Sequence, residues 1–302
     1  MAPCCVAIVG CGLIGASWAA LFQHAGHTVR AWDPDKGARG AGPLTQLQQI
    51  KTGTAPQGGL TVHDRLEDAL RGAVLIQENA PENIPLKHRL YAQIEAAVPR
   101  DVIIASSTSA HPWSDLVPGM RSPDRLITAH PFNPPHLVPL VELYGPDPKV
   151  VDWAEAFYRS LGSAPVRLKK DAVGHIANRL SSALWREAVH IVADGIADVD
   201  AVDMALVNGP GLRWSVLGAH MAYHLGGGVG GMAGYLEHLG PSQQKRWDSL
   251  GSPTLDADTR ARLVEGVNTE AAGRSITQLE AERDAALIEL AQMRQRLAAQ
   301  KD

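Results

Sequence analysis

The first half of the chain alternates short apolar runs with patterns typical of helices. Residues 5–9 are almost entirely apolar, as in a strand that is buried on both faces. A glycine-rich turn follows, and then a helical pattern through residues 17–25 that ends at Gly26, because glycine commonly terminates helices. Residues 28–32 predict a second strand, which leads into Asp33. This order predicts a strand–helix–strand unit with parallel strands.

The same alternation continues to about residue 170. Helices are predicted over residues 66–70 and 85–97, and a short helix with loops is predicted over residues 35–60. Further strands are predicted over residues 74–77, 102–106, 125–129, 137–143 and 166–168. We therefore predict an α/β fold whose first domain is a Rossmann-type, doubly wound parallel sheet.

Strand signals stop after this region. Helical patterns cover residues 173–193, 198–206 and 276–299, and the last of these is amphipathic. We therefore predict two domains, an α/β domain over residues 1–172 and an all-α domain over residues 173–302.

Composition and charge narrow the class of protein. The chain has 302 residues, of which 45% are hydrophobic and 20% charged, as expected for a soluble globular protein. Its net charge of -4 gives no footprint for nucleic acid or for an anionic membrane, and no metal site is expected. The cysteines Cys4, Cys5 and Cys11 lie too close together for a disulfide framework, which favours a reducing compartment. With neither a signal-peptide pattern nor a membrane-length apolar run, we expect a cytoplasmic protein.

A glycine-rich turn joins the first predicted strand to the first helix. Its residues Gly10, Cys11, Gly12, Leu13, Ile14 and Gly15 fit the pattern G-x-G-x-x-G. Such a turn lets a pyrophosphate approach the free N–H groups at the start of the helix. Asp33, at the end of the second strand, is placed to accept hydrogen bonds from an adenosine ribose and to repel a 2′-phosphate. The sequence therefore predicts NAD as the cofactor.

Three alternatives stay open at this point. Lys36 and Arg39 lie close enough in sequence to Asp33 to accommodate NADP. FAD binds a similar turn, and a glycine turn without any ligand gives the same pattern.

Polar residues gather where three predicted strands end. Residues 105–109 carry a run of serine and threonine, residues 128–135 include His130, and residues 140–142 end in Glu142. In open α/β sheets the ligand crevice lies beyond the carboxyl ends of the strands. A serine, a histidine and a glutamate can therefore converge there.

These motifs together resemble the L-3-hydroxyacyl-CoA dehydrogenase family, and most closely its branch with L-gulonate 3-dehydrogenase (lambda-crystallin) and carnitine dehydrogenase. The resemblance covers nearly the whole chain. It rests on the glycine turn, Glu82-Asn83 with Lys87, Ser109, His130 to Pro134, Pro139 to Glu142, and Asn178-Arg179-Leu180. It implies that Glu82, Lys87 and Asn133 lie at the cofactor and that the helical domain forms a homodimer.

The resemblance also implies a catalytic set. His130 is then the general base, Glu142 its carboxylate partner, and Ser109 and Asn178 bind the substrate hydroxyl. The chemistry agrees, since an imidazole with an ordinary pKa near ~6.5 can accept a proton at neutral pH. A carboxylate fixes the tautomer of such a ring, and the nicotinamide takes the hydride.

Two departures from the acyl-CoA enzymes bear on the substrate. Residues 34–60 hold only three cations, Lys36, Arg39 and Lys51, where the phosphates of CoA need several. The segment from Gly209 to Trp214 resembles the gulonate and carnitine branch, and its Arg213 is expected to bind a free carboxylate. We therefore expect a small 3-hydroxy acid, with L-gulonate first and a carnitine-like acid close behind.

Other functions remain in competition. They are a 3-hydroxyacyl-CoA dehydrogenase, a reductase of imines or amines, and an abundant structural protein that keeps a dinucleotide fold. Each polar residue of the catalytic set, and Arg213 as well, also has an ordinary structural explanation, such as a helix cap for Ser109 or a surface ion pair for Arg213. It is the joint spacing that favours an enzyme.

Overall fold

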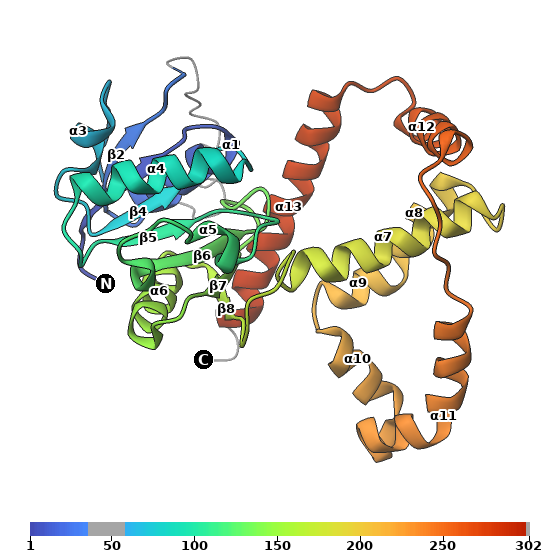
Figure 1. Ribbon diagram of the computed structural model, residues 1–302. Helices are drawn as coiled ribbons and strands as arrows, with labels where there is room; N and C mark the ends of the chain where they lie inside the picture. Colours follow the sequence, from blue (N-terminus) through green and yellow to red (C-terminus); the bar gives the residue numbers. More distant parts are fainter. Residues whose placement is uncertain (36–57, 300–302) are drawn as a thin grey trace. The chain divides into compact units, whose positions relative to one another are not determined.

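The computed structural model describes residues 1–35 and 58–299 and divides into two compact units (Figure 1). The first, here called the sheet unit, comprises residues 1–179 together with residues from Ala281 onward. The second, the helical unit, comprises Leu180–Glu280. The helix with loops predicted over residues 35–60, including its three cations, lies almost wholly outside the described residues.

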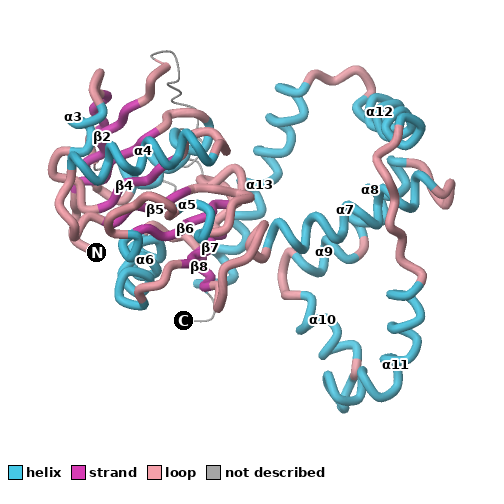
Figure 2. The backbone as a smooth tube through the Cα atoms, viewed as in Figure 1, coloured by secondary structure: helices cyan, strands magenta, loops and turns pink. Residues whose placement is uncertain are grey.

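One sheet of eight strands organises the sheet unit, in the order β3-β2-β1-β4-β5-β6-β7-β8 (Figure 2). The strands are β1 Cys5–Val9, β2 Thr28–Trp32, β3 Leu60–Val62, β4 Leu75–Glu78, β5 Ile103–Ser106, β6 Leu126–Pro131, β7 Leu140–Tyr144 and β8 Ala164–Arg167. The α/β prediction is confirmed, although β3 was not predicted.

The sequence predicted a parallel sheet, but one strand of the observed sheet is antiparallel to its neighbour. Strand β7 runs antiparallel to β6, while all other neighbouring strands pair in parallel. The reason is the short connection, since residues 132–139 leave no room for the crossover helix that a parallel pair requires.

Helices cover both faces of this sheet and complete two hydrophobic cores. The helices are α1 Leu13–His24, α3 Leu66–Leu70, α4 Ile84–Ala97, α5 Trp113–Leu116 and α6 Pro148–Ser160. Alternate residues of β1 enter different cores: Val6 and Ile8 pack with α1 and α6, and Ala7 and Val9 pack with α3 and α4. Burial on both faces explains the continuous apolar run of this strand.

The helix predicted from residue 173 begins later. Helix α7 spans Ala177–Ala193, because Gly174 and His175 both have positive φ angles, of 70° and 50°. L-residues rarely adopt this left-handed conformation, which interrupts a right-handed helix. A turn therefore precedes α7, and its backbone reaches the site described below.

The helical unit, all of whose residues are described, holds no strand. Its helices are most of α7, α8 Val199–Asn208, α9 Pro210–Trp214, α10 Ala219–Gly226, α11 Gly231–Asp248, α12 Ala257–Ala271 and the start of α13 Ile276–Ala299. Few apolar side chains in it are buried, and many large ones are exposed, among them Trp185, Met204 and Trp247. Among the described residues, no helix has the length and apolar character needed to cross a membrane.

Candidate active site

The glycine turn between β1 and α1 leaves space at the helix N-terminus. Gly10 has a φ of 93°, and a Cβ there would lie 2.8 Å from the carbonyl oxygen of Asn79. A Cβ on Gly15 would collide with the carbonyl of Gly10, whereas Gly12 faces open space. The first turn of α1 carries no acidic residue and no side-chain cap. Its N–H groups therefore remain available for an anion.

Asp33 lies beside this turn at the carboxyl end of β2. Its Oδ2 accepts a hydrogen bond from the backbone N–H of Cys11 at 2.6 Å, and its Oδ1 accepts one from Asp35 at 2.8 Å. A carboxylate next to an anion-binding helix start suits a nucleotide ribose beside its phosphates. The residues present thus fit a dinucleotide.

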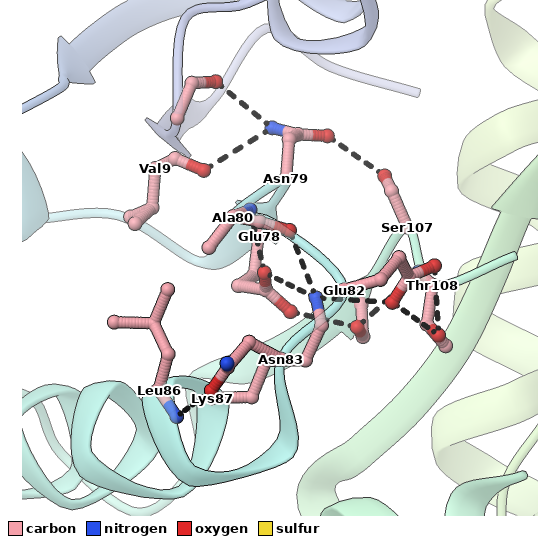
Figure 3. A network of polar contacts seen from close by, with 12 residues as sticks. Val9, Glu78, Asn79, Ala80, Glu82, Asn83, Leu86, Lys87, Ser107 and Thr108 are labelled. Atoms are coloured by element: carbon pink, nitrogen blue, oxygen red, sulfur yellow. Dashed lines mark hydrogen bonds and ion pairs between the residues drawn. The ribbon is translucent and has the colours of Figure 1, made fainter. Parts of the chain in front are cut away.

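Asn79 connects the glycine turn to the end of β5 (Figure 3). Its Nδ2 donates to the carbonyls of Gln77 (3.0 Å) and Gly10 (3.4 Å), and its Oδ1 accepts from the hydroxyl of Ser107 at 2.7 Å. Asn79 was not predicted from the sequence as a site residue. Its position directly after β4, at the crevice edge of the sheet, was the available signal.

Glu82, which was predicted to lie at the cofactor, contacts Ser109, which was predicted to bind the substrate. Its carboxylate accepts hydrogen bonds from the hydroxyls of Thr108 and Ser109, both at 2.9 Å, and from the backbone N–H of Ser109 (Figure 3 shows Glu82 and Thr108). Burial raises the pKa of Glu82, but the Ser109 N–H and the nearby Lys87 charge outweigh it, so the pKa falls below its ordinary value. Glu82 is therefore an anion that orients the Ser109 hydroxyl.

Lys87 points into the protein beneath this loop (Figure 3). Its Nζ lies 2.8 Å from Glu78 Oε1 and 3.1 Å from the carbonyl of Ala80, while Glu82 is 3.8 Å away. Lys87 and Glu78 are 1% and 0% exposed. The second oxygen of Glu78 accepts from the hydroxyls of Tyr91 and Ser106, both at 2.7 Å. The buried pair thus anchors the loop that carries Glu82.

The antiparallel pairing of β6 and β7 sets His130 directly opposite Glu142. His130 Nδ1 lies 2.8 Å from Glu142 Oε2, and both side chains are buried. The other oxygen, Oε1, accepts from the backbone N–H groups of Ile176 (2.8 Å) and Ala177 (2.9 Å), in the turn before α7 and at its first residue. The antiparallel direction of β7 therefore places the two predicted catalytic residues in contact.

These contacts fix the protonation of the pair. Burial raises the pKa of Glu142, but the hydrogen bonds from His130 and from the two backbone N–H groups lower it more, so the pKa lies below its ordinary value. An ionised carboxylate can only accept, so the proton between them belongs to His130 Nδ1. In the neutral ring, Nε2 then carries the lone pair that can accept a proton.

A pocket of ≈ 490 Å³ in the sheet unit brings together six of the predicted site residues. It is lined by Ile14, Glu82, Ser109, His130, Asn133 and Asn178, and in addition by Asn79, Ala80, Pro81, Ser107, Pro131 and Phe132. Asn178 donates to the carbonyl of Ser109 at 2.9 Å, which holds the start of α7 against the β5 loop. Arg213 belongs to the helical unit, where it is exposed in the last turn of α9.

Comparison with known proteins identifies the family. The model of the 3-hydroxyacyl-CoA dehydrogenase, NAD binding domain, matches residues 5–172, and that of the 3-hydroxyacyl-CoA dehydrogenase, C-terminal domain, matches residues 174–257. An L-carnitine dehydrogenase of Nocardiopsis dassonvillei is 44% identical over 296 residues, which cover 95% of this chain and 90% of the relative. One of Pseudomonas aeruginosa is 39% identical over 293 residues, which cover 93% and 91%.

Solved structures agree with this assignment. The crystal structure of 5-formyl-3-hydroxy-2-methylpyridine 4-carboxylic acid 5-dehydrogenase, an NAD+ dependent dismutase, matches with a TM-score of 0.78 at 28% identity and covers 97% of this chain and 98% of that one. An (S)-3-hydroxybutyryl-CoA dehydrogenase of Ralstonia eutropha matches with a TM-score of 0.61 at 27% identity and covers 69% and 79%. The predicted family and the NAD cofactor are confirmed. The chain therefore belongs to the 3-hydroxyacyl-CoA dehydrogenase family and is an NAD-dependent oxidoreductase that acts on CH–OH donors.

Proposed function

We propose that this enzyme oxidises the 3-hydroxyl group of a small free acid that also carries a quaternary ammonium group, as L-carnitine does. The observation that carries the proposal is the group of relatives named L-carnitine dehydrogenase, 39% to 44% identical over nearly the full chain. L-Gulonate, which the sequence analysis placed first, becomes the second choice.

In this proposal His130 removes the hydroxyl proton. Oxidation of a secondary alcohol releases one proton and one hydride, and NAD, when bound, takes the hydride. His130 lines the pocket and Glu142 holds its Nδ1, so its Nε2 is the ring nitrogen left to accept the proton. Glu142 keeps the tautomer and stabilises the imidazolium that forms, because its charge is already fixed by two backbone N–H groups.

Ser109 and Asn178 are proposed to bind the reacting oxygen. The Ser109 hydroxyl donates a hydrogen bond to Glu82. The lone pairs of the Ser109 oxygen therefore remain to accept a hydrogen bond from the substrate hydroxyl. The Asn178 amide lines the same pocket. Both contacts orient the alcohol for transfer of its proton to His130.

The cofactor residues follow the geometry of the turn. Gly10, Gly12, Leu13, Ile14 and Gly15 would hold the pyrophosphate at the start of α1, and Asp33 the adenosine ribose. Glu82 and Asn133 line the pocket and would contact the nicotinamide half. We propose that Lys87 acts indirectly, through the position of Glu82, since its ammonium group is turned towards Glu78.

We further propose that residues 1–172 form the NAD-binding domain and that residues 173–302 form a substrate and dimerisation domain, which gives a homodimer. The helical unit supports this, because large apolar side chains such as Trp185, Met204 and Trp247 are exposed in it while few are buried. We expect light scattering to give twice the mass of the 32.2 kDa chain. A monomer at micromolar concentration would contradict this part of the proposal.

Arg213 is the proposed carboxylate ligand. A guanidinium group binds a carboxylate through two parallel hydrogen bonds, which a thioester cannot accept in the same way. Trp214 and Tyr223 belong to the same unit and each have 40% of their surface exposed. Aromatic faces of this kind attract quaternary ammonium groups.

The test is NADH formation with L-carnitine, L-gulonate, 3-hydroxybutyrate and 3-hydroxybutyryl-CoA. We expect the highest kcat/KM with L-carnitine and a lower one with 3-hydroxybutyrate, which lacks the ammonium group. Arg213→Gln should raise the KM for L-carnitine by about 10–100-fold, the range for a lost hydrogen bond to a charged group, with little change in NAD affinity.

Arg260→Gln is the matched control, because Arg260 is an exposed arginine on α12 of the same unit. It should leave the KM unchanged. Turnover of the CoA ester alone would overturn the free-acid proposal and favour the acyl-CoA branch of the family.

A further inference from the structure

A second buried histidine lies against the proposed base. His175 occupies the turn before α7 in the left-handed conformation and is 1% exposed. Its ring stacks on that of His130, with centroids 4.9 Å apart and planes inclined by 28°. No role for His175 was predicted from the sequence. Its neighbours Ile176 and Ala177 donate to Glu142, so one turn contacts both members of the catalytic pair.

The hydrogen bonds of His175 define its tautomer. Its Nε2 lies 3.1 Å from the backbone carbonyl of Thr108. A carbonyl only accepts, so Nε2 carries the proton. Its Nδ1 is buried and has no hydrogen-bond partner within the described residues. A second proton on this ring would therefore lie on a buried atom without a hydrogen-bond acceptor among the described residues.

The surrounding charges also keep the ring neutral. His130 from β6, Glu142 from β7 and Asp171 from the loop before the turn are the titratable groups that act on it. Burial is the largest effect and His130 adds to it, and together they lower the pKa of His175 despite the opposing effects of Thr108, Glu142 and Asp171. A neutral ring does not repel the imidazolium that forms on His130.

Thr108 connects His175 to Glu82 and so to Ser109. Its hydroxyl donates to Glu82, which also binds the hydroxyl and the backbone N–H of Ser109. His175 therefore touches the base through its ring face and the segment that carries Ser109 through its Nε2–H.

We propose that His175 is a positioning residue that sets the spacing between the base His130 and the substrate-binding segment at Ser109. The proposal rests on the role of His130 as base in the proposed function. His175 holds the plane of the base by stacking and fixes the Thr108 carbonyl by hydrogen bonding. It donates no proton to the substrate and takes none from it.

Three variants separate the two contacts. His175→Phe keeps a stacked ring and loses the donor, His175→Gln keeps a donor of similar reach and loses the ring, and His175→Ala loses both. We expect kcat to fall about 3–10-fold in the first two and about 10–100-fold in the third, the scale for a misplaced catalytic group. The KM and the NAD dissociation constant should change by less than about twofold in all three, since ground-state binding is retained.

His27→Phe is the control, since His27 is also buried in the sheet unit, hydrogen-bonded to the N–H of Cys4 and packed against Phe157. It should lower stability without changing kcat or the pH profile of kcat/KM. The His175 variants should also shift the acid limb of that profile. If they lower only the melting temperature and leave kcat and the profile unchanged, His175 merely packs and the proposal is overturned.

Nuclear magnetic resonance of histidine-labelled, NAD-bound enzyme separates this outcome from failure of the proposed function, since it needs no turnover. We expect the His175 ring to be in its neutral Nε2–H form at pH 7, because its pKa is lowered by burial, and the His130 ring signals to move in His175→Gln but much less in His175→Phe. A protonated His175 ring at pH 7, or unchanged His130 signals in all variants, would overturn the proposal even if none of the four test substrates reacts.

Discussion

His130→Gln is expected to lower kcat by about 10²–10⁴-fold, the usual contribution of a general base, while NAD still binds. Glutamine can donate to Glu142 as the imidazole Nδ1 does, but it offers no basic lone pair to the substrate. The glycine turn and Asp33 are untouched, so the NAD dissociation constant should change little. Initial rates of NADH formation give kcat, and calorimetry gives the dissociation constant.

Two variants make this result specific to the base. His88→Gln replaces a histidine on α4 whose ring contacts the Asp115 carbonyl, and it should keep full activity. The kcat of Glu142→Gln should lie between those of wild type and His130→Gln. The imidazole base remains in this variant, but it is held less firmly and loses its negatively charged partner. A loss of less than about tenfold in His130→Gln would place the base elsewhere, since acid–base groups contribute more than that.

The sequence predicted the buried centre of the sheet well and its edges poorly. Strands β1 and β2 begin and end where predicted, and the apolar run of β1 reflects its burial between two layers of helices. Helix α6 was missed, although Asp147 caps it by accepting from Lys149 and a proline follows as its first residue. The direction of β7 depends on the connection to β6, which strand patterns alone do not show.

In the site too, one contact was predicted from the sequence and another was not. The positions of His130 and Glu142 after predicted strands, together with the family resemblance, made the two residues candidates, and the structure places them in contact. The resemblance placed Lys87 with Glu82 at the cofactor, whereas the closer partner of Lys87 is Glu78. Glu78 was not noticed because a carboxylate at the end of an apolar strand gives no periodic signal. A buried ion pair depends on which way two side chains point, which sequence spacing does not determine.

That buried pair leads to the largest expected effect on stability. Lys87→Met should lower the free energy of unfolding by about 3–5 kcal/mol, because it leaves the fully buried Glu78 charge without its cation. Urea denaturation followed by circular dichroism measures the change. Arg71→Met is the control, since Arg71 forms an exposed pair with Asp68, and its removal should cost less than about 1 kcal/mol.

The double variant Lys87→Met/Glu78→Gln distinguishes charge from packing. It removes the uncompensated charge, so it should recover much of the stability lost in Lys87→Met. It does not restore the bond from Lys87 to the Ala80 carbonyl, which helps hold the loop carrying Glu82. We therefore expect the double variant to fold while its KM for NAD stays raised. If Lys87→Met has the same midpoint urea concentration as wild type, the buried pair contributes nothing to stability. If the double variant has the wild-type KM for NAD, Lys87 does not position this loop.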